Sequence, residues 1–305
     1  FMSKPQSIQV LARHGKSFYW ASYFLGSSLA FRAARLYEFC RFVDDIADGD
    51  LPNRQESLQE ISHSLLDSVS SSQASKIPEL NDFLNLATEA NIPLAAAHEL
   101  LEGMLLDQKP VEFKTEIELL RYCHAVAGTV GLMMCRVLNC SHARADSFAI
   151  DLGIAMQLTN IARDVLEDGK MGRRYIPASW LNIDVSPMDI KNSKHHTHRP
   201  VSDSVDQLLT LAEKYYKSAL VGIRLLPFRS RFAIAVALRI YRQIGIVLRR
   251  RKLAWWSGRV MVGKAEKFLL SIRSLGELIP VTVPEHDGKL HKHLKGLAGV
   301  SNDQT

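Results

Sequence analysis

The chain has 305 residues, 47% of them hydrophobic and 23% charged, which is enough to bury one large core or two smaller ones. Its formal charge of +6 suggests an anionic partner such as a diphosphate or a membrane surface, and no basic stretch is interleaved with aromatic residues, which argues against nucleic acid. No apolar run reaches membrane-spanning length, no signal-peptide pattern is present and the four cysteines form no CxxC pair, so we expect a cytoplasmic protein with free thiols.

Helical patterns fill most of the chain. Residues 7–48 contain few helix breakers and predict two helices, and a Ser-rich loop is expected at 68–75. Further helices are predicted at about 54–69, 79–90, 93–106, 115–138, 146–167, 202–223 and 229–252. Gly128 and Gly131 fall inside one of these helices, where they would allow close packing or leave room for a ligand.

No alternation of apolar and polar residues of any length occurs, so a sheet-based fold is not expected. We predict a single all-α domain, a bundle of about ten helices whose acidic residues point into a central cavity. The helical domain is placed at 14–279, after an N-terminal segment at 1–13, and a loose, basic, flexible tail is expected at 280–305.

Acidic residues recur at helical spacing in the first third of the chain. Tyr37, Arg41, Asp44 and Asp48 follow at steps of four, three and four, which places them on one face of a helix. Taken alone, such a stripe is as well explained by a solvated helix face.

The same pattern returns in the middle of the chain. Gln157, Asn160, Asp164 and Asp168 stand at steps of three, four and four within a predicted helix. Like charges one turn apart destabilise a helix, and a hard divalent cation such as Mg2+ would offset them. Two facing stripes would hold a cluster of Mg2+ ions, with a diphosphate completing the coordination.

Basic residues flank these stripes. Lys16 and Ser17 lie near a predicted helix start, where backbone N–H groups favour an anion. Lys170, Arg173 and Arg174 lie in a glycine-containing loop that would close over phosphates, or would simply be a mobile surface loop.

Two further stretches carry open alternatives. The arginine run 249–251 is followed by Lys252, Trp255 and Trp256, and this basic helix end with paired Trp would dock at a membrane interface, or the Trp rings would be buried in the core. His195, His196 and His198 lack a partnering acid and read as a solvated loop rather than a metal site.

The two acidic stripes, preceded by the Lys-Ser element, resemble the squalene/phytoene synthase family, the head-to-head prenyl condensing enzymes. The matching segments are 14–18, 36–48, 101–107, 122–134, 152–177 and 240–245. Within the family, the likeness is closest to bacterial phytoene synthases. The resemblance implies an isoprenoid-synthase-type helical bundle.

The resemblance also implies roles for single residues. Five would ligate Mg2+, with Mn2+ as a substitute: Asp44, Asp48, Asn160, Asp164 and Asp168. The substrate-binding set would be His14, Lys16, Ser17, Tyr37, Arg41, Gln157, Arg163 and Tyr241. The residues carrying catalysis would be Asp44, Asp48, Asp164, Asp168, Tyr37 and Arg41. Asp45 belongs to the first motif, but its helical angle disfavours direct ligation, and Gly15 stands where some relatives have Ser.

The implied reaction joins two geranylgeranyl diphosphates into 15-cis-phytoene through a cyclopropyl diphosphate intermediate, with no need for NADPH. The released diphosphate or Tyr37 would take the final proton. Ser22, Gly26, Ala30 and Ala34 are small at steps of four and would line a floor long enough for a C20 chain, or pack helices closely. The alternatives are a C30 synthase making dehydrosqualene or squalene from farnesyl diphosphate, and a non-catalytic lipid-binding or assembly factor. A peripheral contact with the inner membrane is compatible with either function, and the oligomeric state stays open.

Overall fold

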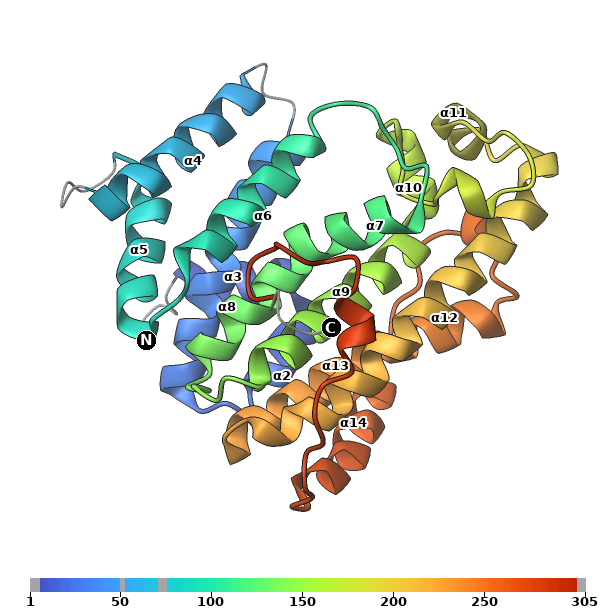
Figure 1. The fold of residues 1–305 in the computed structure, drawn as a ribbon. Coiled ribbons are helices and arrows are strands. Elements are labelled where there is room, and N and C mark those ends of the chain that lie inside the picture. Colours follow the sequence, from blue (N-terminus) through green and yellow to red (C-terminus); the bar gives the residue numbers. More distant parts are fainter. Residues whose placement is uncertain (1–5, 50–52, 71–75, 301–305) are drawn as a thin grey trace.

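The computed structural model describes residues 6–49, 53–70 and 76–300 and confirms the all-α prediction (Figure 1). The first half contains α1 Gln6–His14, α2 Lys16–Ser22, α3 Ser27–Asp48, α4 Arg54–Ser70, α5 Pro78–Ala90, α6 Leu94–Leu106, α7 Glu116–Cys123 and α8 Thr129–Val137. The second half contains α9 Ala145–Arg163, α10 Val165–Lys170, α11 Pro187–Lys191, α12 His198–Gly222, α13 Phe228–Arg250 and α14 Lys264–Arg273. No helix within the described ranges is long and apolar enough to cross a membrane.

The N-terminal stretch forms three helices instead of the predicted two. Gly15 separates α1 from α2, and Gly26 precedes α3 with φ +80°, a conformation that residues with a Cβ rarely adopt. Leu11 of α1 is buried, so this helix belongs to the packed unit and contributes its last residue, His14, to the site described below.

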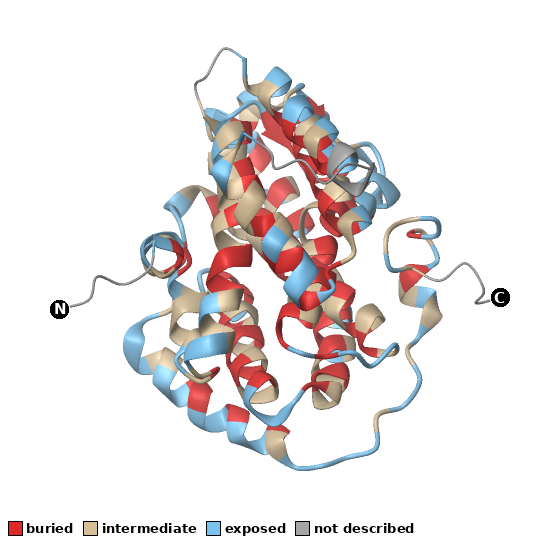
Figure 2. Cartoon of the chain, turned by 90° about the vertical axis from the view of Figure 1, so that its left-hand side faces the viewer, coloured by how far each residue is buried: buried red, intermediate tan, exposed pale blue. Residues whose placement is uncertain are grey.

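Helix α9 is the central element of the fold and packs against α8, α12 and α13. Close approach depends on glycine, because a Cβ on Gly131 would lie 2.1 Å from the Ala149 carbonyl oxygen. A Cβ on Gly153 would lie 2.1 Å from the Ala127 carbonyl oxygen. Of the two alternatives for the helical glycines, close packing is therefore the correct one for Gly131. The buried residues concentrate where helices face one another (Figure 2).

The helix predicted to run unbroken to residue 167 is interrupted at Asp164. Its φ of −106° and ψ of 17° end α9 and begin α10. The hydrogen bonds from Asp164 N to Asn160 O and from Asp168 N to Asp164 O, both 2.9 Å, carry the helical spacing across the break. The acidic stripe therefore continues on one side of the chain.

A short parallel strand pair departs from the all-helical prediction. β1 Val111–Glu112 pairs with β2 Arg173–Arg174, which fixes the glycine-containing loop after α10 against the end of α6. The interpretation of this loop as a mobile surface segment is therefore wrong for the part that contains Arg173 and Arg174, both of which are buried.

The C-terminal segment differs from the loose tail that composition predicted. After α14 and the short helix Ser274–Leu278, residues 283–300 run across α7, α8 and α9 (Figure 1, red). Leu294 is completely buried, and the backbone N–H of Ala298 donates to Glu99 of α6 at 2.8 Å. We call residues 283–300 the C-terminal strap. Placing the domain boundary at residue 279 remains a prediction.

The aromatic pair near residue 255 is packed and does not project outward. Trp255 is 2% exposed, and Trp256 stacks on His198 with ring centroids 3.8 Å apart. Core burial is therefore the correct alternative for Trp255. The four cysteines are free.

Candidate active site

One cavity of about 800 Å³ collects all the residues to which the family resemblance assigned metal binding, substrate binding or catalysis. Its lining includes His14, Lys16, Ser17, Tyr37, Arg41, Asp44, Asp48, Gln157, Asn160, Arg163, Asp164, Asp168 and Tyr241. These residues come from α1, α2, α3, α9, α10 and α13, so segments more than two hundred positions apart meet around one space. Their roles remain predictions, but their convergence is a property of the fold.

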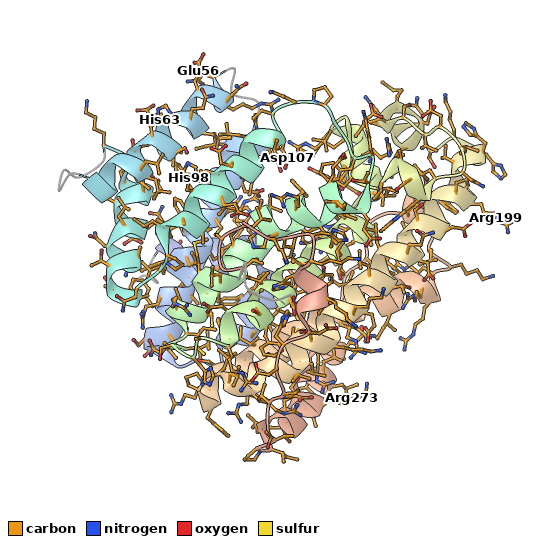
Figure 3. The ribbon with its side chains drawn as sticks, viewed as in Figure 1. Glu56, His63, His98, Asp107, Arg199 and Arg273 are labelled. Carbon is orange, nitrogen blue, oxygen red and sulfur yellow. The ribbon has the colours of Figure 1, made fainter. Side chains whose placement is uncertain are left out.

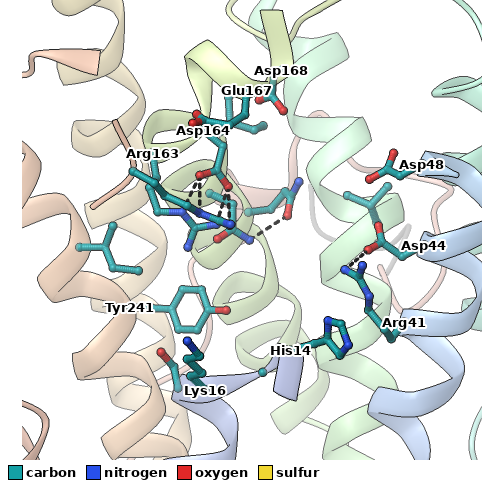
Figure 4. A pocket seen from close by; sticks show the side chains of 18 of the residues that line it. His14, Lys16, Arg41, Asp44, Asp48, Arg163, Asp164, Glu167, Asp168 and Tyr241 are labelled. Carbon is teal, nitrogen blue, oxygen red and sulfur yellow. Dashed lines mark hydrogen bonds and ion pairs between the residues drawn. The ribbon is translucent and has the colours of Figure 1, made fainter. Parts of the chain in front are cut away.

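The two acidic stripes face each other across this cavity (Figure 4). Asp44 and Asp48 stand one turn apart on α3, and Asp164 and Asp168 flank the first turn of α10 on the other wall. Asp45, next to Asp44, is exposed and does not line the cavity. The helical angle therefore separates the two neighbouring carboxylates, as the sequence suggested.

Arginines neutralise most of these acids. The Arg41 guanidinium donates to Asp44 at 2.8 Å and also pairs with Asp45, and Arg173 donates to Asp48 at 2.8 Å. Asp164 accepts from Arg163 at 2.5 Å and from Arg259 at 3.0 Å. The cavity thus holds guanidinium groups beside carboxylates, and a bound diphosphate would offer the same groups bidentate acceptors.

Burial and mutual repulsion act on the acids. Burial, followed by the negative charge of Asp48, raises the pKa of Asp44 to about 6. Burial and then the charge of Asp164 raise the pKa of Asp168 well above its usual range. Carboxylates held close enough to disfavour each other's ionisation form a site that gains from added positive charge.

The donor set fits a hard divalent cation. Asn160 Oδ1 is buried and has no hydrogen-bond partner among the described residues, although Asn160 lines the cavity together with the acids. An orphaned amide oxygen beside carboxylate oxygens matches the all-oxygen ligand sets of Mg2+, which retains several waters. The residues that would hold the ion are Asp44, Asp48, Asn160, Asp164 and Asp168.

The start of α2 forms the base of the cavity. His14, Gly15, Lys16 and Ser17 all contribute to its lining. A Cβ on Gly15 would lie 2.9 Å from both Leu11 and the Tyr37 ring, so the absence of a side chain here keeps Tyr37 in place. Lys16 and Ser17 therefore line the same cavity as the acids, and the side chain of Lys16 is seen at its base in Figure 4.

Beyond the polar rim, the cavity wall becomes aromatic and apolar. Phe18 lies 5.2 Å from Tyr241 and 6.3 Å from Tyr37 between ring centroids. The apolar lining also includes residues from five different segments, Met104, Val126, Ile161, Ile244 and Val260. Such a wall presents aromatic rings to a passing positive charge.

Sequence reasoning missed two parts of the site. Arg259 lies in the coil before α14 and belongs to no sequence motif. It contacts Asp164 only because the chain folds back to the cavity there. Asp107 is the last residue of an acid-containing run, and that run could have identified it as a site residue. Its carboxylate accepts hydrogen bonds from the hydroxyl of Tyr122 at 2.7 Å and from that of Tyr175 at 2.8 Å. Figure 3 shows Asp107 at the end of α6.

Two sequence-based hypotheses are corrected here. In the loop after α10, Arg173 lines the cavity, but Lys170 does not, and Arg174 points to the carbonyl oxygens of Phe113 and Ile176. The small-residue stripe also lies away from the cavity: Ser22, Gly26, Ala30 and Ala34 are absent from its lining. Close helix packing is the reading that fits Ala34, which is fully buried.

The sequence profile of the squalene/phytoene synthase family matches residues 11–266. The chain belongs to this family. Among its relatives, the 15-cis-phytoene synthase of Pantoea ananas is 31% identical over 291 residues, covering 92% of this chain and 93% of its own. The 15-cis-phytoene synthase of Enterobacter agglomerans is 33% identical, covering 89% of this chain and 94% of its own.

Solved structures of squalene/phytoene synthase family members share the fold. A dehydrosqualene synthase in complex with a ligand superposes with a TM-score of 0.78 at 27% identity, covering 89% of this chain and 95% of its own. The squalene synthase HpnC from Alicyclobacillus acidocaldarius gives a TM-score of 0.70 at 21% identity, covering 83% and 95%, which speaks to the fold alone.

Proposed function

We propose that this enzyme condenses two geranylgeranyl diphosphates head to head into 15-cis-phytoene in carotenoid biosynthesis. The observation that carries the proposal is that two acidic stripes, from α3 and from α9–α10, face each other across one cavity. Basic residues lie at the bottom of this cavity, and apolar residues form part of its wall. The phytoene synthases of two bacteria, each about a third identical over nearly the full length, support the C20 substrate.

The chain's own residues would bind and orient the diphosphates. Lys16 and Arg259 stand beside the acidic stripes with their charges directed to the cavity, and Arg41 and Arg163 can exchange a carboxylate for a phosphate oxygen. When bound, Mg2+ would supply Lewis-acid chemistry that weakens the bond to the leaving diphosphate. The residues proposed to hold it are Asp44, Asp48, Asn160, Asp164 and Asp168, and Mn2+ would serve in its place.

The remaining work is to protect and deprotonate a carbocation. The Phe18, Tyr37 and Tyr241 rings would stabilise positive charge, and the apolar wall would keep water away from it. Burial raises the pKa of Tyr37 to about 12, so its phenol stays protonated at neutral pH. Of the two candidate bases, the released diphosphate is therefore the better acceptor for the final proton.

A C30 synthase using farnesyl diphosphate is the second candidate, and the dehydrosqualene synthase structure favours keeping it in the test. Purified protein should be incubated with Mg2+ and either C15 or C20 diphosphate, with and without NADPH, and the hydrocarbons separated by chromatography. We expect a C40 triene from the C20 substrate, unchanged by NADPH. A C30 product formed in preference would assign the second candidate, and no diphosphate release from either substrate would indicate a non-catalytic protein.

We also propose that the enzyme docks on a lipid surface through α14. This helix buries Leu270 and Ser271 but exposes Phe268, Leu269 and Ile272, the reverse of an ordinary surface helix. The apolar surface continues through Leu275, Ile279 and Val281. We call these six exposed residues the α14 face.

An anionic membrane is the partner that fits the α14 face. Lys264 and Arg273 are exposed at the two ends of the helix, and Figure 3 shows Arg273 at the outer end of the molecule. The neighbouring residues Met261, Val262 and Lys267 line the cavity, so one stretch of the chain contributes both to the cavity and to the apolar surface. Long-chain substrate and product would then pass between cavity and bilayer without crossing water.

A further inference from the structure

The C-terminal strap brings two histidines onto a buried carboxylate of the central helix. His286 Nε2 lies 2.8 Å from Asp151 Oδ2, and His291 Nε2 lies 2.7 Å from Asp151 Oδ1. Asp151 is completely buried on α9, and it does not line the cavity described above. The three residues therefore form a cluster that the proposed reaction does not use.

Neighbouring groups hold this cluster in place. Ser218 of α12 donates to Asp151 Oδ2 at 2.5 Å, and Tyr215 donates to the backbone carbonyl of Leu290 at 3.0 Å. The His286 ring meets the edge of Phe148 with centroids 5.2 Å apart. The side chains of both histidines are 7% exposed, so the imidazoles are positioned in a nearly closed space.

The charge of Asp151 is compensated in an unusual way. Among the described residues, no lysine or arginine pairs with it; its partners are two imidazoles and one hydroxyl. Burial would raise the pKa of this carboxyl, but the hydrogen bonds and charge from His286 and His291 outweigh that effect and lower it. The pocket thus favours an ionised carboxylate facing two nitrogen ligands.

We propose that Asp151, His286 and His291 form a structural zinc site that fastens the C-terminal strap to α9. One ligand atom from each residue lies within 4.8 Å of the others. Two imidazole nitrogens and a carboxylate oxygen are the ligands that Zn2+ takes in proteins. Ligand atoms about 2.0 Å from a tetrahedral ion stand roughly 3.3 Å apart, so each imidazole would retreat by about 0.5 Å.

The proposed site is chemically separate from the acidic cavity. The five residues proposed to hold Mg2+ in the cavity offer only oxygen atoms, whereas imidazole nitrogen selects Zn2+ and Co2+. Ser218 would act as the outer partner that orients the carboxylate. The inference does not depend on the reaction proposed above, because binding here can be measured without substrate.

The test uses the full-length protein, freed of metal by a chelator and then held in excess Mg2+ to occupy the oxygen site. One equivalent of Co2+ is added as a spectroscopic probe, and retained Zn2+ is measured after dialysis. The variant is His286→Gln with His291→Gln. The matched control is His293→Gln, which changes a histidine of the same strap whose side chain does not contact Asp151.

We expect wild type and the control to retain one Zn2+ after dialysis. With Co2+ in place of Zn2+, both should show the strong visible absorption of low-coordinate Co2+. Both should also melt at a higher temperature with Zn2+ than without it. The double variant should bind more weakly by more than the roughly 100-fold that loss of an outer-shell partner costs. Retention of Zn2+ by the double variant would overturn the proposal. So would a wild-type melting temperature that responds to pH but not to Zn2+, since that result assigns a purely protonic contact.

Discussion

Two adjacent carboxylates of the first acidic motif allow the proposed role in metal binding to be tested at the level of single residues. Asp44 lines the cavity, whereas Asp45 is exposed and only pairs with Arg41. Asp44→Asn should lower the rate of diphosphate release by about 100-fold or more, because charge stabilisation in the transition state is lost. Asp164→Asn should behave in the same way.

The matched control is Asp45→Asn, which should keep turnover within about threefold of wild type because surface ion pairs contribute little. Circular dichroism should show that all three variants fold. Equal loss of activity in the Asp44 and Asp45 variants would contradict the assignment of the cavity-facing carboxylate as the metal ligand.

The site was largely predictable residue by residue because its signals are local. The stripe of Asn160, Asp164 and Asp168 follows from helical spacing alone, and it survives the break at Asp164 because the hydrogen bonds to the preceding turn persist. Arg259 could not be predicted, since it reaches Asp164 only through the path of a coil. Contacts between side chains that are distant in the sequence produce no periodic pattern from which they could be predicted.

Close packing between helices provides a prediction at the scale of elements. Gly131→Ala places a Cβ 2.1 Å from the Ala149 carbonyl oxygen of α9, so α8 must move away from the central helix. The free energy of unfolding should fall by about 1–3 kcal/mol, as in other overpacked cores. Denaturant unfolding measures this loss of stability. Gly276→Ala is the control, because nothing lies within 4 Å of a Cβ at residue 276.

The contact between α6 and the C-terminal strap should depend on pH. Burial would raise the pKa of Glu99, but hydrogen bonds from His124 at 2.7 Å and from the Ala298 backbone at 2.8 Å lower it below the usual 4.5. Because the folded-state pKa is lowered, this stabilisation is present above about pH 4.5 and is lost as pH falls through the folded-state pKa.

Glu99→Gln should therefore cost about 1 kcal/mol at pH 7, since an amide N–H would face a donor, and should cost nothing in strong acid. Unfolding curves across pH for wild type, Glu99→Gln and the exposed control Glu102→Gln measure this difference. A difference between the first two that stays constant down to the lowest pH would count against a stabilising carboxylate.

Element boundaries were harder to predict than element type. The helix pattern located α5, α6, α12 and α13 to within a few residues, because each carries a long apolar period. Two features escaped it: α14, whose apolar residues face outward, and the strap, whose polar composition hides the contacts of Leu294 and Ala298. A polar composition shows that a segment can be exposed to water. It does not show whether the folded protein offers a surface against which that segment packs.

At the scale of the whole molecule, the α14 face predicts lipid binding. Phe268→Glu with Ile272→Glu should weaken binding to anionic vesicles by more than about tenfold, because two side chains no longer leave water. Activity on detergent-dispersed substrate should be retained. Vesicle sedimentation measures the effect, and the control is Ile183→Glu with Met188→Glu, which changes exposed apolar residues around α11.

Unchanged sedimentation of the α14 variant, or an equal loss in the control, would exclude this surface as the membrane contact. Concentration-dependent self-association that disappears in the α14 variant would instead assign the face to a second copy of the chain.

The docked strap sets a limit on how far the protein can be shortened. The match to the family profile ends at residue 266, and cutting there would remove His286, His291 and the backbone at Ala298 together. Asp151 would then keep Ser218 as its sole remaining partner among those described, and His124 would lose its acceptor at residue 298. We expect such a trimmed protein to expose α9 to solvent and aggregate, so the natural place to cut lies beyond residue 300.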